Sequence, residues 1–233
     1  MSDRPLTPLV DDRIWSTERP VWFSGVRLRA RTTVVRLDDG GLLLHSPAPP
    51  GEAMAAQLRA LGPVRWLVVP NAFHHLGAPA AAACFPEAKV VGPASARDHN
   101  PALRLDLDLR DAGFAAQVPE VEALPLEGVP FLDETVLFHR PTQTLLGTDI
   151  VLSAAPEDHW TWRGAARLLG CFQRLSVPHD VRPKISDRSA AARSLQAMLQ
   201  RPARRLIVAH AGVVEAGCLD HLAAAWRRAG VEV

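Results

Sequence analysis

The sequence predicts a layered fold that mixes α-helices and β-strands, and three patterns along the chain carry this prediction. The residues Asp38-Asp39-Gly40-Gly41 separate two apolar runs, which is a strong signal for a β-hairpin. Residues 64–69 (VRWLVV) are almost entirely apolar, as in a strand that is covered on both faces. A helical segment precedes a strand twice, over 54–69 and over 78–92, and this alternation is typical of layered α/β architectures.

The first half of the chain supplies most of these elements. Residues 26–31 alternate between apolar and basic side chains, which predicts a strand with one face in water. Met54, Leu58 and Leu61 fall on one face of a helix that Gly62-Pro63 ends. The other elements predicted here are strands at 33–37, 42–45 and 88–92, a helix over 78–83, and irregular structure with short elements over 94–125.

The second half repeats the order of hairpin, helix and strand. Residues 135–139 and 143–148 flank Arg140-Pro141-Thr142 and predict a second hairpin. The last helix is predicted from the helical spacing of its large apolar residues between Leu219 and Trp226. The remaining predictions are an amphipathic helix around 160–175, a helix with Ala191, Leu195, Met198 and Leu199 on one face, and a strand at 205–209.

Composition limits the classes of protein that this chain can be. Its 233 residues are compatible with one domain over 1–233, in which 1–25 is an N-terminal extension. The 48% content of hydrophobic residues is enough for a sizeable core. Lysine and arginine total 26 against 25 acidic residues, so the chain has no basic surplus for nucleic acid. The sequence does not fix the oligomeric state.

The cysteines and the N-terminus bear on localisation. Cys84, Cys171 and Cys218 are scattered and odd in number, which fits a reducing compartment better than a disulfide framework. The first residues carry charges and prolines where a signal peptide needs an apolar run. No apolar stretch approaches the roughly 18 residues of a membrane span. We therefore expect a cytoplasmic protein without a membrane partner.

Potential metal ligands follow three of the predicted strands. Strand 64–69 runs into Pro70-Asn71-Ala72-Phe73-His74-His75, the second hairpin runs into Asp149, and strand 205–209 runs into His210. Histidine and carboxylate ligands suit zinc, iron or manganese. Each position alone is better explained by a loop hydrogen bond or a helix cap. Because the pattern recurs after three strands, metal binding becomes a serious alternative.

Four segments together resemble the metallo-β-lactamase fold superfamily. They are RTTVVRLDDGGLLLHSP, RWLVVPNAFHHLG, ETVLFHRPTQTLLGTD and RLIVAHAG, and the resemblance spans roughly residues 30–230. It points to a branch with a Pro-Asn-x-x-His-His turn. The resemblance implies a four-layer αββα sandwich with its site at one edge of two sheets.

The turn departs from the superfamily pattern of His-x-His-x-Asp-His. Asn71 and Phe73 fall where the two histidines of the first metal site belong, and residues 126–130 lack the third. His74 and His75 match the Asp and the last His of the pattern. The resemblance also assigns Asp149 and His210 as ligands. It thus implies that the first metal site is lost and that His74, His75, Asp149 and His210 hold one divalent ion, zinc or iron.

This ligand set leads to a functional hypothesis with two alternatives. We predict a metal-dependent hydrolase that acts on an ester, thioester or lactone of a small-molecule substrate, with Asp149 and Asn71 as catalytic residues. Asn71 would orient the nucleophilic water or the substrate, although an asparagine in a turn more often caps a helix or forms the turn. The alternatives are an inactive binding protein that keeps the fold and a non-haem iron protein for oxygen or redox chemistry.

Two further features have structural explanations that we favour. His139 precedes the tight turn at Arg140-Pro141-Thr142, where a histidine usually bonds the turn rather than a metal. Trp160 and Trp162 could form a binding surface, but core packing of the amphipathic segment is the better explanation.

Overall fold

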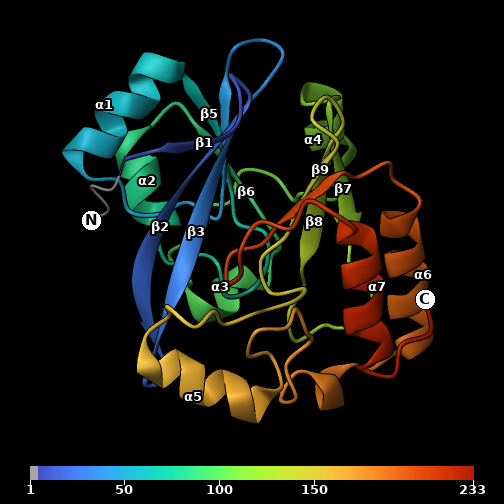
Figure 1. The fold of residues 1–233 in the computed structure, drawn as a ribbon. Helices are drawn as coiled ribbons and strands as arrows, with labels where there is room; N and C mark the ends of the chain where they lie inside the picture. The colour runs from blue at the N-terminus through green and yellow to red at the C-terminus, as the bar shows by residue number, and fades with distance from the viewer. Residues whose placement is uncertain (1–4) are drawn as a thin grey trace. The chain divides into compact units, whose positions relative to one another are not determined.

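The computed structural model describes residues 5–233 and contains two β-sheets and seven α-helices among them, so the predicted mixed α/β class is confirmed (Figure 1). The strands are β1 (Thr7–Val10), β2 (Ile14–Phe23), β3 (Val26–Arg36), β4 (Leu42–His45), β5 (Val64–Val68), β6 (Lys89–Val91), β7 (Val121–Pro125), β8 (Thr135–His139), β9 (Thr144–Leu146) and β10 (Arg205–Ile207). The helices are α1 (Glu52–Leu61), α2 (Ala78–Cys84), α3 (Ala96–His99), α4 (Ala112–Gln117), α5 (Trp160–Leu169), α6 (Arg188–Leu199) and α7 (Cys218–Arg227), with a 3₁₀ turn η1 at Arg182–Lys184.

The described chain divides into two compact units. Unit 1 comprises the residues through Arg19 together with Arg31–Ala123, and unit 2 comprises Pro20–Ala30 and Leu124–Val233. The strands β2 and β3 continue along the chain from one unit into the other. The organisation as one domain over 1–233 stays a prediction. Among residues 5–233, no helix has the length and apolar character needed to cross a membrane.

Unit 1 is built on the six-stranded sheet, whose order is β1-β2-β3-β4-β5-β6. The strands β3 and β4 are antiparallel with Val35 opposite Leu43, which confirms the hairpin at Asp38–Gly41. The strands β4, β5 and β6 are parallel, as expected for segments joined by helices. The strands predicted separately at 26–31 and 33–37 are one continuous strand, β3.

The core of unit 1 lies between this sheet and the helices α1 and α2. The buried side chains of the sheet in this core include Leu42, Leu44 and Leu67. Met54 and Leu58 of α1 pack against them, on the helix face that the sequence predicts. Because β5 is buried on both faces, its C-terminal end can lead into a turn whose backbone is fixed by the surrounding core.

The residues predicted as an N-terminal extension form part of this sheet. Within 1–25 the structure describes β1 and β2, and Thr7 lies opposite Ser16 in an antiparallel pair. Ile14 and Trp15 of β2 are buried. These two strands were hard to predict, because charged residues interrupt the apolar ones at the start of the chain.

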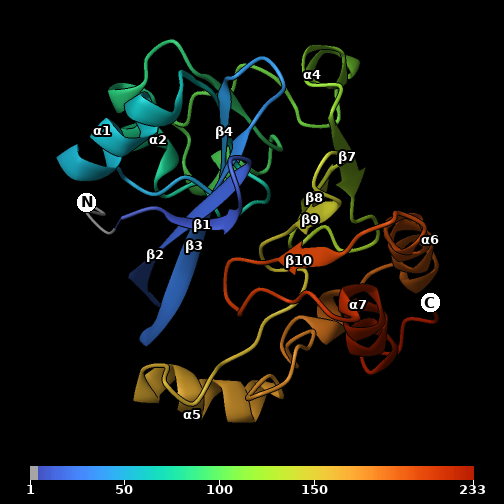
Figure 2. The same cartoon turned by 45° about the horizontal axis from the view of Figure 1, so that its top comes forward.

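Unit 2 is built on the four-stranded sheet, whose order is β10-β9-β8-β7. The strands β8 and β9 form the predicted second hairpin, with Phe138 opposite Leu145. The strand β10 adds to β9 in parallel, so β9 and β10 end at the same edge of the sheet. The helices α6 and α7 contact each other, and α7 contacts β10 (Figure 2). Residues 149 and 210, which follow β9 and β10, are thereby brought to one edge.

The amphipathic segment around 160–175 is helical only as far as Leu169. Gly170 ends α5 with φ +73°, a conformation that favours glycine. Trp162 and Ala166 of the helix are buried in a small core with Cys171. Residues 94–125, expected to be irregular with short elements, contain α3, α4 and β7.

Candidate metal centre

A wholly buried glutamate fixes the backbone that carries Asp149. Glu134 is 0% exposed, and its carboxylate accepts hydrogen bonds from the backbone N–H groups of Thr148 and Asp149, the latter at 2.9 Å. Gly147 lies so close that an added Cβ would meet the side chains of Ile150 and Glu134. Glu134 was not identified as a site residue from the sequence alone. The available signal was an acidic residue directly before the apolar strand β8.

His210 is held by a backbone carbonyl far away in the sequence. Its ring is 9% exposed, and Nδ1 forms a hydrogen bond with the carbonyl oxygen of Arg29. A carbonyl oxygen can only accept, so Nδ1 carries the proton and a neutral ring has its lone pair on Nε2. That is the state in which a histidine binds metal, since metal-binding histidines commonly donate their other N–H to a carbonyl or carboxylate.

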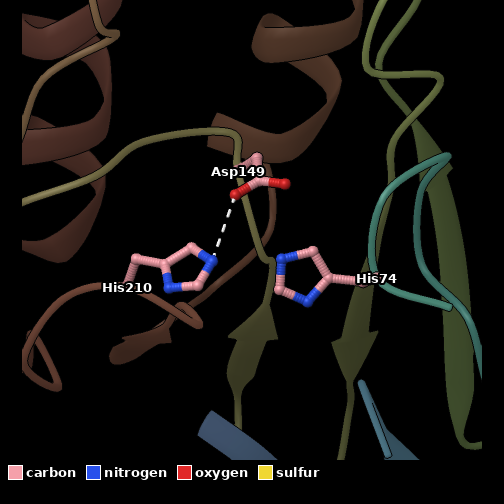
Figure 3. Close-up of side chains that lie close together, drawn as sticks. All are labelled: His74, Asp149 and His210. Carbon is pink, nitrogen blue, oxygen red and sulfur yellow. Dashed lines mark ion pairs between the residues drawn. The ribbon is translucent and has the colours of Figure 1, made fainter. Parts of the chain in front are cut away.

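The two side chains face each other at a distance that suits a shared ion. His210 Nε2 lies 3.6 Å from Asp149 Oδ1 (Figure 3). This separation exceeds that of a normal N–H···O hydrogen bond. Two ligands of one tetrahedral zinc ion, with bonds of about 2.0–2.1 Å, are about 3.3 Å apart. Two facing acceptor atoms are stabilised by a shared cation or by protonation of the ring, so this pair fits a metal ion.

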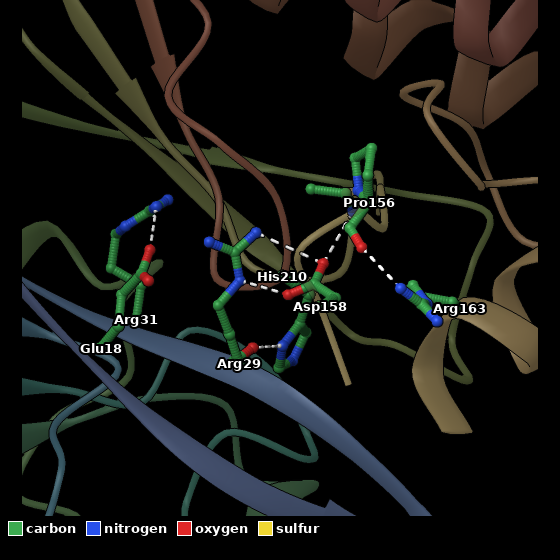
Figure 4. A network of polar contacts seen from close by, with 8 residues as sticks. Glu18, Arg29, Arg31, Pro156, Asp158, Arg163 and His210 are labelled. Carbon is green, nitrogen blue, oxygen red and sulfur yellow. Dashed lines mark hydrogen bonds and ion pairs between the residues drawn. The ribbon is translucent and has the colours of Figure 1, made fainter. Parts of the chain in front are cut away.

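An ion pair holds the residue that supplies the carbonyl. Arg29 Nε lies 2.6 Å from Asp158 Oδ1, and the Asp158 side chain is only 3% exposed (Figure 4). Asp158 Oδ2 also accepts a hydrogen bond of 2.7 Å from the backbone N–H of Ala155. Asp158 therefore ties the strand β3 to the segment after Asp149, and it keeps the Arg29 carbonyl in place for His210.

In unit 1, Asn71 shapes the turn that follows β5. Its side chain is fully buried, and Oδ1 accepts hydrogen bonds from the backbone N–H groups of Phe73 (2.9 Å) and His74 (2.8 Å). This arrangement is an Asx turn. The turn-forming role favoured for an asparagine at this position is confirmed, whereas its catalytic role stays a prediction.

The histidine after this turn is oriented by a serine. His74 Nδ1 lies 2.7 Å from Ser46 Oγ, so metal binding by His74 would use Nε2. Ser46 is buried, and its carbonyl accepts a hydrogen bond from Thr32 Oγ1 at 2.7 Å. His74 is half-buried and therefore remains accessible to a ligand.

The next histidine has different surroundings. His75 is buried, its Nδ1 has no hydrogen-bond partner among the described residues, and its ring is parallel to that of His99 at 6.2 Å. Burial lowers the pKa of His75, and the charges of His99 and His74 lower it further.

His45, the last residue of β4, is a second buried histidine of unit 1. Burial lowers the pKa of His45 to about 3, with a smaller contribution from His74. Both rings are thus neutral at neutral pH.

The structure brings two of the predicted ligands together within unit 2, Asp149 and His210. It places Asn71, His74 and His75 in one turn of unit 1. Residues 126–130, where the superfamily pattern has a third histidine, make backbone contacts within unit 2. There the Gly128 carbonyl accepts hydrogen bonds from the backbone N–H groups of Ser186 and Asp187.

The features with favoured structural explanations behave largely as predicted. His139 is fully buried and its Nδ1 lies 2.8 Å from Thr142 Oγ1, which confirms its role in the turn. Trp162 belongs to the small core at α5, as expected. The expectation is wrong for Trp160, which is 70% exposed because it lies on the outer face of the same helix.

Solved structures with the same fold are metallo-β-lactamases. The enzyme from Pontibacter korlensis has 14% identity and a TM-score of 0.63, with 96% of this chain and 98% of that chain covered. The mono-zinc form of FIM-1 from Pseudomonas aeruginosa has 14% identity and a TM-score of 0.67, with 98% of each chain covered. The enzyme from Erythrobacter litoralis has 14% identity and a TM-score of 0.65, with 96% of each covered. At this identity the likeness shows the fold alone.

The sequence itself matches one family. No curated protein matches the chain. The model of a family described as Domain of unknown function (DUF4336) matches residues 11–160, a range that includes Asn71, His74, His75 and Asp149 but ends before His210. The match covers more than half of the chain, so the protein belongs to the DUF4336 family and has a metallo-β-lactamase-like fold.

Proposed function

We propose that this protein is a metal-dependent hydrolase that acts on an ester, thioester or lactone of a small molecule. One zinc or iron ion would be held by His74, Asp149 and His210, each of which can offer one ligand atom. The observation that carries the proposal is the pair in unit 2, where His210 Nε2 faces Asp149 Oδ1 at 3.6 Å. His75 stays a further candidate ligand.

The number and type of these ligands agree with a catalytic ion. Catalytic zinc sites commonly have three protein ligands and keep the fourth position for water or substrate. Two imidazoles and a carboxylate suit zinc, and they also suit ferrous iron. A similar structure, FIM-1, was obtained in a mono-zinc form. A single ion is therefore compatible with this fold.

His210 and Asn71 would have separate roles beside a bound ion. A bound ion would lower the pKa of a coordinated water and polarise the carbonyl of the substrate. His210 keeps its Nε2 lone pair directed at Asp149 because Nδ1 donates to Arg29. Asn71 would orient water or substrate through its amide N–H groups, since its oxygen is committed to the turn.

A binding protein without catalysis is the second candidate, and the turn of unit 1 favours it. Asn71 and Phe73 occupy the positions where the resemblance expects the first two histidines. Asn71 Oδ1 is engaged in the turn, and the Phe73 ring lies against His99 at 4.9 Å. Neither residue supplies a metal ligand of the usual first site.

Turnover measurements separate the two candidates. Metal-stripped protein would be reloaded with zinc or ferrous iron and tested with p-nitrophenyl acetate, an acyl thioester and a homoserine lactone. We expect turnover that requires the metal and that falls at least about 100-fold in Asp149→Asn, because a charged ligand is lost. His179→Gln, which changes an exposed histidine, is the matched control. Fully metal-loaded protein without turnover on any substrate would overturn the hydrolase proposal.

A further inference from the structure

Three arginines of unit 2 converge on one loop. We define Arg174, Arg182 and Arg228 as the arginine cluster; they come from the loop after α5, from η1 and from the end of α7. Each donates to the backbone of residues 170–177. The bonds run from Arg174 Nη2 to Gly170 O (3.2 Å), from Arg182 Nε to Val177 O (3.1 Å) and from Arg228 Nη2 to Leu175 O (2.7 Å).

Among the described residues, these three guanidinium groups donate hydrogen bonds to oxygen atoms of the loop rather than forming ion pairs. Within residues 5–233, none of the three guanidinium groups forms an ion pair, and Asp180 in the same region forms none with them either. Burial lowers the pKa of Arg182 and of Arg228, and the nearby charge of Arg174 lowers both further. The cluster therefore carries repulsion between like charges that an anion would relieve.

The loop beneath the cluster is held firmly in place. Ser176 exchanges two backbone hydrogen bonds with Leu152, at 2.9 and 3.0 Å. The Cys171 carbonyl accepts a bond of 2.9 Å from Ala154, and the Cys171 side chain is buried in the core of α5. Because the backbone acceptors are fixed, the guanidinium groups bonded to them are positioned before any ligand arrives, which reduces the entropic cost of binding.

A purely structural role explains each arginine separately but not the group. Arg174 and Arg228 follow the C-terminal ends of α5 and α7, where positive charge is favourable. This role uses one donor of Arg174 and one of Arg228, and each guanidinium has five. It does not require three such groups to donate to one loop with no ion pair to them among residues 5–233.

We propose that the arginine cluster binds the phosphoryl group of a small ligand. A phosphoryl group has three outer oxygens and a charge close to −2, so it can accept from three guanidinium forks at once. A carboxylate offers only two oxygens and a single charge. None of the three arginines is among the predicted metal ligands, and nothing in the hydrolase proposal depends on them.

Calorimetric titration of the full chain with inorganic phosphate and with glycerol phosphate tests this site, at constant ionic strength set with chloride. We expect saturable binding of one phosphoryl group per chain. Arg182→Gln and Arg228→Gln should each raise the dissociation constant about 10-fold or more, since each removes charge-assisted hydrogen bonds. Tighter binding of glycerol phosphate would identify a phosphorylated metabolite as the ligand, and tighter binding of inorganic phosphate would identify the free ion.

Two controls keep the result specific. Arg193→Gln changes an exposed arginine of α6 and should leave the dissociation constant unchanged. The Asp149→Asn variant should also keep phosphate binding, which excludes binding at the metal centre. Thermal unfolding in chloride checks that the cluster variants remain folded. Absence of saturable binding up to tens of millimolar, or equal weakening by Arg193→Gln, would overturn the proposal.

Discussion

The predicted site residues of the two units are held in place by different kinds of contact. In unit 2, Asp149 and His210 depend on Glu134 and on the Arg29 carbonyl, which lie 15 and 181 positions away in the sequence. In unit 1, the turn at 71–75 is shaped by Asn71, which bonds residues two and three positions ahead. A distant contact is present in unit 1 as well, since His74 Nδ1 lies 2.7 Å from Ser46 Oγ, 28 positions earlier. Distant partners thus hold both predicted ligands of unit 2, whereas in unit 1 a local turn sets the backbone and one distant serine orients His74.

This difference has a functional meaning. Catalytic and metal-binding groups need neighbours that hold them within a narrow range of positions. Unit 2 has such neighbours for both of its predicted ligands. In unit 1, Asn71 and Phe73 stand at the positions where the resemblance expects histidines, and the buried His75 has Nδ1 without a hydrogen-bond partner among the described residues. We therefore expect the proposed metal binding to depend mainly on Asp149 and His210.

The largest loss of stability is expected when the glutamate that supports Asp149 is replaced. Glu134→Ala leaves the backbone N–H groups of Thr148 and Asp149 without their buried acceptor. Each unsatisfied donor costs about 1–3 kcal/mol, so the free energy of unfolding should fall by about 3 kcal/mol or more. Urea denaturation measures the loss, and zinc affinity should fall about 10–100-fold as for other outer partners of a metal site.

Glu134→Gln is the control for this experiment. The amide keeps one acceptor oxygen, so the loss of stability should be clearly smaller than in Glu134→Ala. If both variants retain the stability and zinc affinity of the unchanged protein, Glu134 does not support the site and the contrast between the two units disappears.

A smaller effect is expected from the turn of unit 1. Asn71→Ala removes the acceptor of two backbone N–H groups and should lower the free energy of unfolding by about 1–2 kcal/mol. Asn71→Asp keeps an acceptor oxygen and should keep most of the stability. Comparing hydrolysis rates of the two variants tests the catalytic role: a loss of turnover in Asn71→Asp with stability intact would show that the amide N–H groups act on substrate.

The smallest effect is expected from the ion pair behind His210. Asp158→Asn keeps the size of the side chain and weakens its bond to Arg29, which is itself 34% exposed. We expect about 1 kcal/mol of stability to be lost, since partial exposure reduces the contribution of an ion pair. Zinc affinity should fall roughly 10-fold because the Arg29 carbonyl loses its support. An unchanged affinity by calorimetry would mean that the strand β3 holds Arg29 without Asp158.

Much of the fold followed from local patterns. The hairpin at Asp38–Gly41, the buried strand β5 and the apolar face of α7 were all predictable, because turn residues and periodic apolar residues act over short distances. The strands β1 and β2 were not, since charged residues interrupt them and pairing partners decide their structure. The length of β3 was underestimated for the same reason.

Prediction of the site residues from the sequence was limited in the same way. Asp149 and His210 could be identified because a polar residue directly follows each strand, and the structure confirms their proximity. The supporting residues Glu134 and Asp158 were missed, because their roles depend on contacts that only the folded chain creates. The role of Asn71 in the turn was foreseen, because capping and turn formation are the common roles of an asparagine at such a position.

The metal content of the protein, purified without tag or chelator, is the sharpest test of metal binding by Asp149 and His210. Elemental analysis would compare the unchanged protein with Asp149→Asn, His210→Gln and His74→Gln, using the exposed His221→Gln as control. We expect about one zinc or iron ion per chain, which Asp149→Asn and His210→Gln lose and His221→Gln keeps. Protein that stays metal-free after incubation with zinc and with ferrous iron, or variants of Asp149 and His210 that keep their full metal content, would contradict this expectation.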